Sequence, residues 1–168
     1  MLWCPSVGSP QGVPQTALPA PPSAAEAAAL TPFPVPSFGL NPQQLGLSGL
    51  ASWFWARNVP SILTSTSSVR GYIVVTTAEP VKYYWYFGDG GIATSSTAGT
   101  QTAPSAIHTY QSKSLYTVTL TVAWQGQYTF SGNGVPTQTV QLGTVDQPPA
   151  TTTYRVQEIR SVLVTPTS

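Results

Sequence analysis

Residues 115–124, LYTVTLTVAW, constrain the fold of this 168-residue chain more than any other stretch. The apolar side chains of this stretch share one parity: Tyr116, Val118, Leu120, Val122 and Trp124. Thr117, Thr119 and Thr121 take the other parity. Because successive side chains of a strand point to opposite faces, the pattern predicts a half-buried antiparallel strand with one dry face and one wet face.

Other segments also have the composition of strands. Residues 59–68 and 71–78 are rich in Thr, Ser and Val, and the second segment ends at Glu79-Pro80, which is a turn signal. Residues 81–87, VKYYWYF, follow directly. A period of two places Tyr83, Trp85 and Phe87 on one face of that strand, and Lys82, Tyr84 and Tyr86 on the other.

The remaining segments complete an all-β pattern. Residues 92–106 are polar and predict a loop with at most a short edge strand, whereas Gly132-Asn133-Gly134 predicts a hairpin or an irregular insertion. Residues 151–164 are rich in Thr, Val, Tyr and Ile and predict a closing strand. Short strands separated by turns are typical of an antiparallel β-sandwich of two sheets.

The N-terminal part differs in amino-acid composition from the rest. Most of the 17 prolines precede residue 43, and we interpret residues 1–49 as an extended Pro/Ala-rich tether. Ser23 and Glu26 form a capping box ahead of a run of alanines, but a helix of this length is marginal by itself and should be frayed or docked. Residues 50–164 are then the sandwich and residues 165–168 a C-terminal tail.

Composition excludes several classes of function. Only 7% of residues are charged and the net charge is +1, so the sequence predicts no nucleic-acid partner. No apolar run is long enough to insert into a membrane, and Cys4, as the one cysteine, excludes an internal disulfide. The first residues lack a basic segment and an apolar segment, so no export signal is visible. Thr and Ser supply the polar surface, which suits an extracellular or cell-surface domain.

Three ordered motifs carry a resemblance to a known family. YWYFGDGG, IHTY and SLYTVTLTV resemble the signature of PKD domains, which are immunoglobulin-like β-sandwiches. The resemblance covers about residues 60–124, and the matching positions are Trp85, Phe87, Gly88, Asp89, Gly90, His108, Tyr110, Tyr116, Val118, Leu120 and Val122. Tyr86 departs from the pattern, since the family usually has Asp there, and so does Ser114-Leu115, where Gly is usual.

A narrower resemblance reaches beyond that core. GLASWFWARNVP, VAWQGQYTF and YRVQEIRSVL are similar to segments of actinobacterial exported PKD-domain proteins of unassigned role. This resemblance implies an exported protein, associated with a pilus or with secretion. Those relatives usually carry cysteines in the loop before the His-x-Tyr motif, and this chain has none there.

Asp89 and His108 are the residues that most resemble an active site. With one of the serines they would have the composition of a hydrolytic triad, but no Gly-x-Ser-x-Gly elbow accompanies them. An Asp between glycines in a tight turn more often accepts backbone N–H groups, and we expect His108 to pack or hydrogen-bond beside that turn. One His and one Cys do not make a zinc site, and scattered acids do not make a calcium site. We therefore predict a non-catalytic protein without a metal or a cofactor.

Two aromatic clusters are candidate binding surfaces. Lys82, Tyr84 and Tyr86 would form a flat platform for a sugar or a partner protein. We expect instead that residues 53–55, WFW, or the tether cover this platform within the same chain. Within residues 53–55, Trp53 and Trp55 should plug the end or the flank of the sandwich.

These observations predict an exported, non-catalytic module with a structural, adhesion or assembly role at the cell envelope. Its partners would be other envelope proteins or glycans. The alternative is a carbohydrate-binding accessory module that uses the surface aromatics. A hydrolase built on Asp89 and His108 is the third hypothesis.

Overall fold

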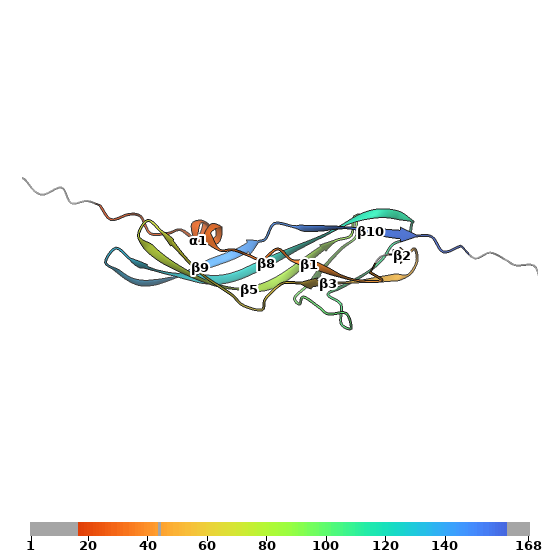
Figure 1. The fold of residues 1–168 in the computed structure, drawn as a ribbon, viewed down its shortest axis with the longest axis horizontal. Coiled ribbons are helices and arrows are strands. Elements are labelled where there is room, and N and C mark those ends of the chain that lie inside the picture. Colours follow the sequence, from red (N-terminus) through yellow and green to blue (C-terminus); the bar gives the residue numbers. More distant parts are fainter. Residues whose placement is uncertain (1–16, 44, 161–168) are drawn as a thin grey trace, which may run out of the picture.

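The computed structural model describes residues 17–43 and 45–160. Cys4, residues 161–164 of the predicted closing strand and the predicted tail lie outside the described residues. The body is elongated, with helix α1 (Ala24–Leu30) and strand β9 (Val135–Asp146) toward one end, and β2 (Leu45–Leu47) and β10 (Ala150–Gln157) toward the other (Figure 1). The first and last described residues lie at opposite ends of the long axis (Figure 1).

Within the described residues, two sheets make up the β structure. The smaller sheet has the order β1-β3-β7 and consists of β1 (Ser37–Asn41), β3 (Ala51–Arg57) and β7 (Ala106–Thr109). The larger sheet has the order β2-β10-β8-β5-β4, with β6 also paired to β5 and β9 also paired to β8. Its other strands are β4 (Leu63–Val69), β5 (Tyr72–Tyr86), β6 (Ile92–Ser95) and β8 (Ser114–Gly132). Every pair is antiparallel except β2 with β10.

Strands β5 and β8 run the length of the molecule as a continuous antiparallel pair (Figure 1). The sequence predicted that β5 would be two strands separated by a turn at Glu79-Pro80, and that prediction was wrong. The register shifts between Pro80 and Lys82, which leaves Val81 as an additional residue on β5. Such a bulge tolerates Pro80, which has no N–H to donate, and it reverses the parity of the buried side chains.

One hydrophobic core lies on the inner face of the large sheet. Before the bulge, β5 buries Tyr72, Val74 and Ala78, and after it Tyr83 and Trp85. The second half of this face packs against β3 of the small sheet, where Phe54 is fully buried and its ring lies 5.1 Å from that of Phe87. The sequence predicted that Trp53 and Trp55 would plug the end or the flank of the sandwich. Phe54 enters the core between the sheets, and Trp55 is also buried, with its ring against Gly39 of β1.

The first half of the inner face is covered by residues 17–36, which we call the strap. Helix α1 has the predicted capping box between Ser23 and Glu26, and it buries Ala27 completely. The Tyr72 hydroxyl donates to the carbonyl of Pro19 at 2.8 Å, and the Tyr128 hydroxyl donates to that of Pro22 at 2.9 Å. The strap therefore forms part of the hydrophobic core of this half.

Two further contacts fix the strap. Arg70 lies in the turn between β4 and β5, and its Nη2 donates to Oε2 of Glu26 at 3.0 Å. The hydrogen bonds from Arg70 and from Ser23 lower the pKa of Glu26 to about 2. Beyond the helix, the Phe33 ring packs 5.5 Å from the ring of Trp124. The described part of the predicted tether thus differs from an extended linker. Residues 17–36 pack on the large sheet, β1 is a strand of the small sheet, and β2 is a strand of the large sheet.

Candidate functional site

The GDGG turn after β5 is held by hydrogen bonds to backbone and side chain. Phe87 N–H donates to the Gly91 carbonyl at 3.0 Å, and Gly91 N–H donates to Asp89 Oδ1 at 2.9 Å. The other oxygen, Asp89 Oδ2, lies 2.7 Å from Nε2 of His108 on β7. Gly88 has φ of 84°, and a Cβ there would lie 2.7 Å from the Thr117 carbonyl oxygen, so the turn requires glycine at this position.

Aromatic rings hold the imidazole in place. The His108 ring stacks on Phe87 with centroids 4.1 Å apart, and the edge-on ring of Tyr110 lies 4.6 Å away. Tyr110 donates its hydroxyl to the Phe87 carbonyl at 3.1 Å and stacks on Tyr116 at 4.3 Å. The residues of the sequence motif therefore form one contiguous cluster around the turn.

The protonation states of Asp89 and Tyr110 are compatible with contacts that stabilise the turn. Partial burial raises the pKa of Asp89, but the hydrogen bonds from His108 and from the Gly91 amide outweigh it and hold that pKa below its ordinary value. Burial, together with the nearby charge of Asp89, raises the pKa of Tyr110 well above its ordinary value. Asp89 is consequently a carboxylate and Tyr110 a neutral phenol at neutral pH.

The geometry around Asp89 and His108 does not present a nucleophile. Within residues 17–43 and 45–160, no Ser or Thr hydroxyl is hydrogen-bonded to His108, and Ser52, its partner in β-sheet register, bonds the Tyr154 hydroxyl at 3.0 Å instead. Surface hollows formed by the described residues lie elsewhere and are lined by other residues. The described residues contain no group of three or more His, Cys, Asp or Glu side chains that could hold a metal ion. The arrangement can hold a turn closed, which does not require a chemical step.

Replacing Asp89 with Asn is expected to lower the free energy of unfolding by about 1–2 kcal/mol at neutral pH, because a partly exposed, charge-assisted hydrogen bond is lost. Because the folded-state pKa of Asp89 is lowered, the stability it provides is present above its ordinary pKa and is lost as the pH falls through the lowered value. Urea unfolding of both proteins between neutral and acid pH should give curves that converge in acid.

Asp146→Asn is the matched control for this charge change. Asp146 is an exposed carboxylate with no hydrogen bond to another side chain in the described residues. Its replacement should alter stability by less than about 0.5 kcal/mol. Equal losses for the two variants would contradict the bracing role of Asp89.

The candidate platform lies on the outer face of the large sheet. Tyr86 is 48% exposed, Tyr84 is half-buried, and Lys82 Nζ lies 5.3 Å from the centre of the Tyr84 ring. We expected residues 53–55 or the tether to cover these tyrosines, but β3 and the strap both pack on the opposite, inner face. Among the described residues, the platform is therefore open to solvent.

Threonine rows extend the platform across the sheet. Thr119 lies opposite Tyr86 and Thr121 opposite Tyr84 on β8, and Thr151 lies opposite Thr119 on β10. On the other side of β5, the exposed Ile92 of β6 pairs with Tyr86. The outer face here combines aromatic rings with neutral hydroxyl groups.

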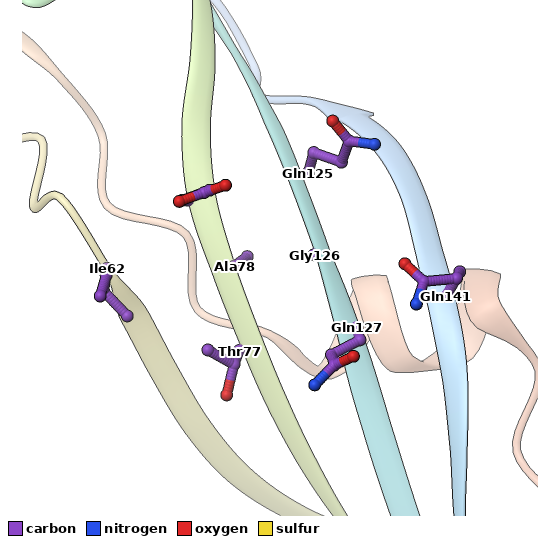
Figure 2. A pocket seen from close by; sticks show the side chains of 8 residues that line it. Ile62, Thr77, Ala78, Gln125, Gly126, Gln127 and Gln141 are labelled. Carbon is purple, nitrogen blue, oxygen red and sulfur yellow. The ribbon is translucent and has the colours of Figure 1, made fainter.

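An open hollow lies further along the same sheet, beside the bulges. It measures ≈ 410 Å³, and Figure 2 shows the side chains that line it. They are Ile62, Thr77, Ala78, Glu79, Gln125, Gly126, Gln127 and Gln141. The register between β8 and β9 shifts here, with Gly126 opposite Gly143 and Gln127 opposite Gln141, so that amide side chains from both strands reach the hollow. The lining includes one carboxylate and no cation.

The fold and the turn define an immunoglobulin-like β-sandwich, as the sequence predicted. Residues 53–126 match the family model of the PKD domain, and this range includes the whole aromatic cluster around Asp89. Comparison with curated proteins and with solved structures gives no match. A PKD domain indicates a structural or protein-interaction module. No helix in the described part of the chain is long and apolar enough to cross a membrane.

Sequence reasoning missed the hollow, and it left docking as one of two alternatives for the helix of the strap. The hollow depends on bulges in β5 and β9, and the sequence signals for these were Pro80 and Gly143 in otherwise regular strands. For the strap, the available signal was the capping box at Ser23 with a charged partner, Arg70, far along the chain.

Proposed function

We propose that this chain is a non-catalytic module of the cell envelope, acting as a structural spacer and as an adhesion or assembly domain that binds another envelope protein. The observation that carries the proposal is the uncovered outer face around Tyr84 and Tyr86. Tyrosines on a flat, rigid strand contribute contact area at a low entropic cost, and they are enriched at protein interfaces.

The shape supports the spacer part of the proposal. The described chain enters at one end of the long axis and leaves at the other (Figure 1). The 19-residue strand β8 corresponds to about 60 Å at a rise of about 3.3 Å per residue. A body of this kind separates whatever precedes it from whatever follows it.

Export to the envelope rests on surface chemistry. The polar outer positions of β4, β8 and β10 are mostly Thr, Ser and Gln, and only 7% of the chain is charged. Such a surface gives little long-range electrostatic steering, so partner choice depends on close contact. Fractionation of cells of the source organism tests this part directly, and a purely cytoplasmic chain would contradict it.

A second candidate function is binding of a neutral polysaccharide by the same outer face. The observation in its favour is the lining of the hollow, where amide side chains and the Glu79 carboxylate can bond hydroxyl groups of a sugar. The exposed ring of Tyr86 would stack on the apolar face of a sugar elsewhere on the sheet.

The double variant Tyr84→Ser/Tyr86→Ser tests both functions. We expect it to reduce capture of the envelope partner, measured by cross-linking and copurification, at least about tenfold, because tyrosines that become buried against a partner are frequent interface hot spots. Sedimentation with insoluble polysaccharides forms the second arm. A loss in that arm alone would select the carbohydrate function.

Ile73→Ser is the matched control. Ile73 is 55% exposed on the outer face of the same strand, before the bulge. This variant should retain capture, and both variants should melt close to the wild type because the changes lie on the surface. Unchanged capture by the double variant would contradict the platform.

A further inference from the structure

Strand β4 is an open edge of the large sheet. In the part of the chain that the structure describes, β4 pairs only with β5, so one side of its backbone has no strand partner. Natural proteins usually protect such edges with charges, prolines or bulges. Residues Leu63–Val69, LTSTSSV, contain no charged residue and no proline, and their register with β5 is unbroken.

The edge of β9 is better protected than that of β4. Pro136 lies near its start and lacks an N–H group, and the register with β8 shifts after Gln141. Both features interrupt pairing with a further strand. Strand β4 therefore offers the longer uninterrupted edge for addition of a strand.

The sequence of β4 is self-complementary when read antiparallel. We propose that β4 pairs with β4 of a second copy of this chain, about a two-fold axis that passes through Thr66. The opposed residues would be Leu63 with Val69, Thr64 with Ser68, Ser65 with Ser67, and Thr66 with itself. Each pair matches in chemistry, and aliphatic and hydroxyl pairs of this kind stabilise antiparallel strands.

The faces of the strand also agree with this register. Thr64, Thr66 and Ser68 are exposed on the outer face, whereas Leu63 and Val69 are half-buried on the strap side. A two-fold axis normal to the sheet keeps each face with its equivalent in the second copy. Shifting the axis to Ser65 would place Leu63 opposite Ser67 and lose the aliphatic match.

Charge does not oppose the pairing. Arg70, the first charged residue after β4, is hydrogen-bonded to Glu26 and would lie beside Ile62 of the second copy, far from its own equivalent. The contact is isologous, so it closes after two chains and gives a dimer with a continuous sheet across both copies. This inference does not depend on the tyrosine platform, which lies beyond the bulge and near β6.

Sedimentation equilibrium of the full chain tests the proposal. From micromolar to millimolar concentration, the apparent mass should rise from one chain of 17.7 kDa toward twice that mass. Thr66→Lys and Thr66→Glu should each raise the dimer dissociation constant at least about tenfold, because two like charges then face each other at the axis. An equimolar mixture of the two variants should recover the mass of the wild type.

The controls separate this edge from other contacts. Thr139→Lys places the same charge on the exposed side of β9 and should leave the dimer intact. The Thr66 side chain is exposed in the single chain, so both Thr66 variants should fold, which thermal melting verifies. A wild type that remains monomeric, a Thr66→Lys variant that dimerises normally, or a mixture that fails to recover would each overturn the proposal.

Discussion

Replacing Trp85 with Ala is expected to lower the free energy of unfolding by about 3–5 kcal/mol. The indole has no exposed surface and lies between the two sheets, with the rings of Phe38 and Phe54 centred 5.7 and 6.0 Å away. Its N–H donates to Ser105 Oγ at 3.0 Å. Truncation leaves a cavity among side chains that cannot close together and removes the partner of a hydroxyl group.

Urea unfolding followed by circular dichroism measures the loss. The midpoint should fall without a change in the slope, since the folded and unfolded states keep their compactness. Tyr84→Ala is the matched control, because Tyr84 is the preceding residue of β5 and points to the outer face. That change should cost less than about 1 kcal/mol, and equal costs would contradict the assignment of the two faces.

The two faces of the sheet could be predicted because side-chain parity is a local property. The alternation in residues 115–124 placed Val118, Leu120 and Val122 together, and all three are fully buried. The same rule separated Trp85 from Tyr86, which is 48% exposed. The prediction of an immunoglobulin-like sandwich of the PKD type is confirmed by the architecture and by the match over residues 53–126.

The length of β5 and β8 could not be predicted from the same signals. Glu79-Pro80 and Gly126 resemble breaks between strands, but the strands continue through both positions, where the register shifts at a bulge. A Cβ at Gly126 would lie 2.1 Å from the Thr77 carbonyl oxygen, so this glycine permits close approach of two strands and does not mark a turn. Whether a glycine or a proline ends a strand depends on its neighbour across the sheet, which one sequence does not reveal.

For the strap, the sequence left the frayed and the docked helix as alternatives, and the reason is different. Carbonyl groups of the strap accept hydrogen bonds from Tyr72 and Tyr128, and such contacts leave no periodic pattern in the proline-rich segment. The proximity of Asp89 and His108, in contrast, could be predicted from the sequence, because both residues lie in a recognisable motif. Exposure of the tyrosine platform depends on which face of the sheet the strap covers. This exposure could therefore be established only from the structure.

Replacing Ala27 with Asp is expected to undock the strap and to lower the free energy of unfolding by about 3 kcal/mol or more, because a buried charge without a partner is strongly destabilising. Ala27 is fully buried on the inner face of α1, in the same core cluster as Tyr128 and Trp124. The alternative to burying the charge is to release the helix, which exposes the rings beneath it. The loss in the free energy of unfolding cannot exceed the free energy with which the strap docks, so the measured loss is a lower limit for that docking free energy.

Ala29→Asp is the matched control, because it introduces the same residue on the exposed face of the same short helix. Limited proteolysis should cleave residues 17–36 of the Ala27→Asp variant rapidly and leave the Ala29→Asp variant close to the wild type, with the thermal midpoints in the same order. If both variants resist cleavage equally, the strap is not held by the burial of Ala27. If both are cleaved equally fast, loss of helix propensity explains the effect, and the docked strap contributes little to the stability of this half of the sheet.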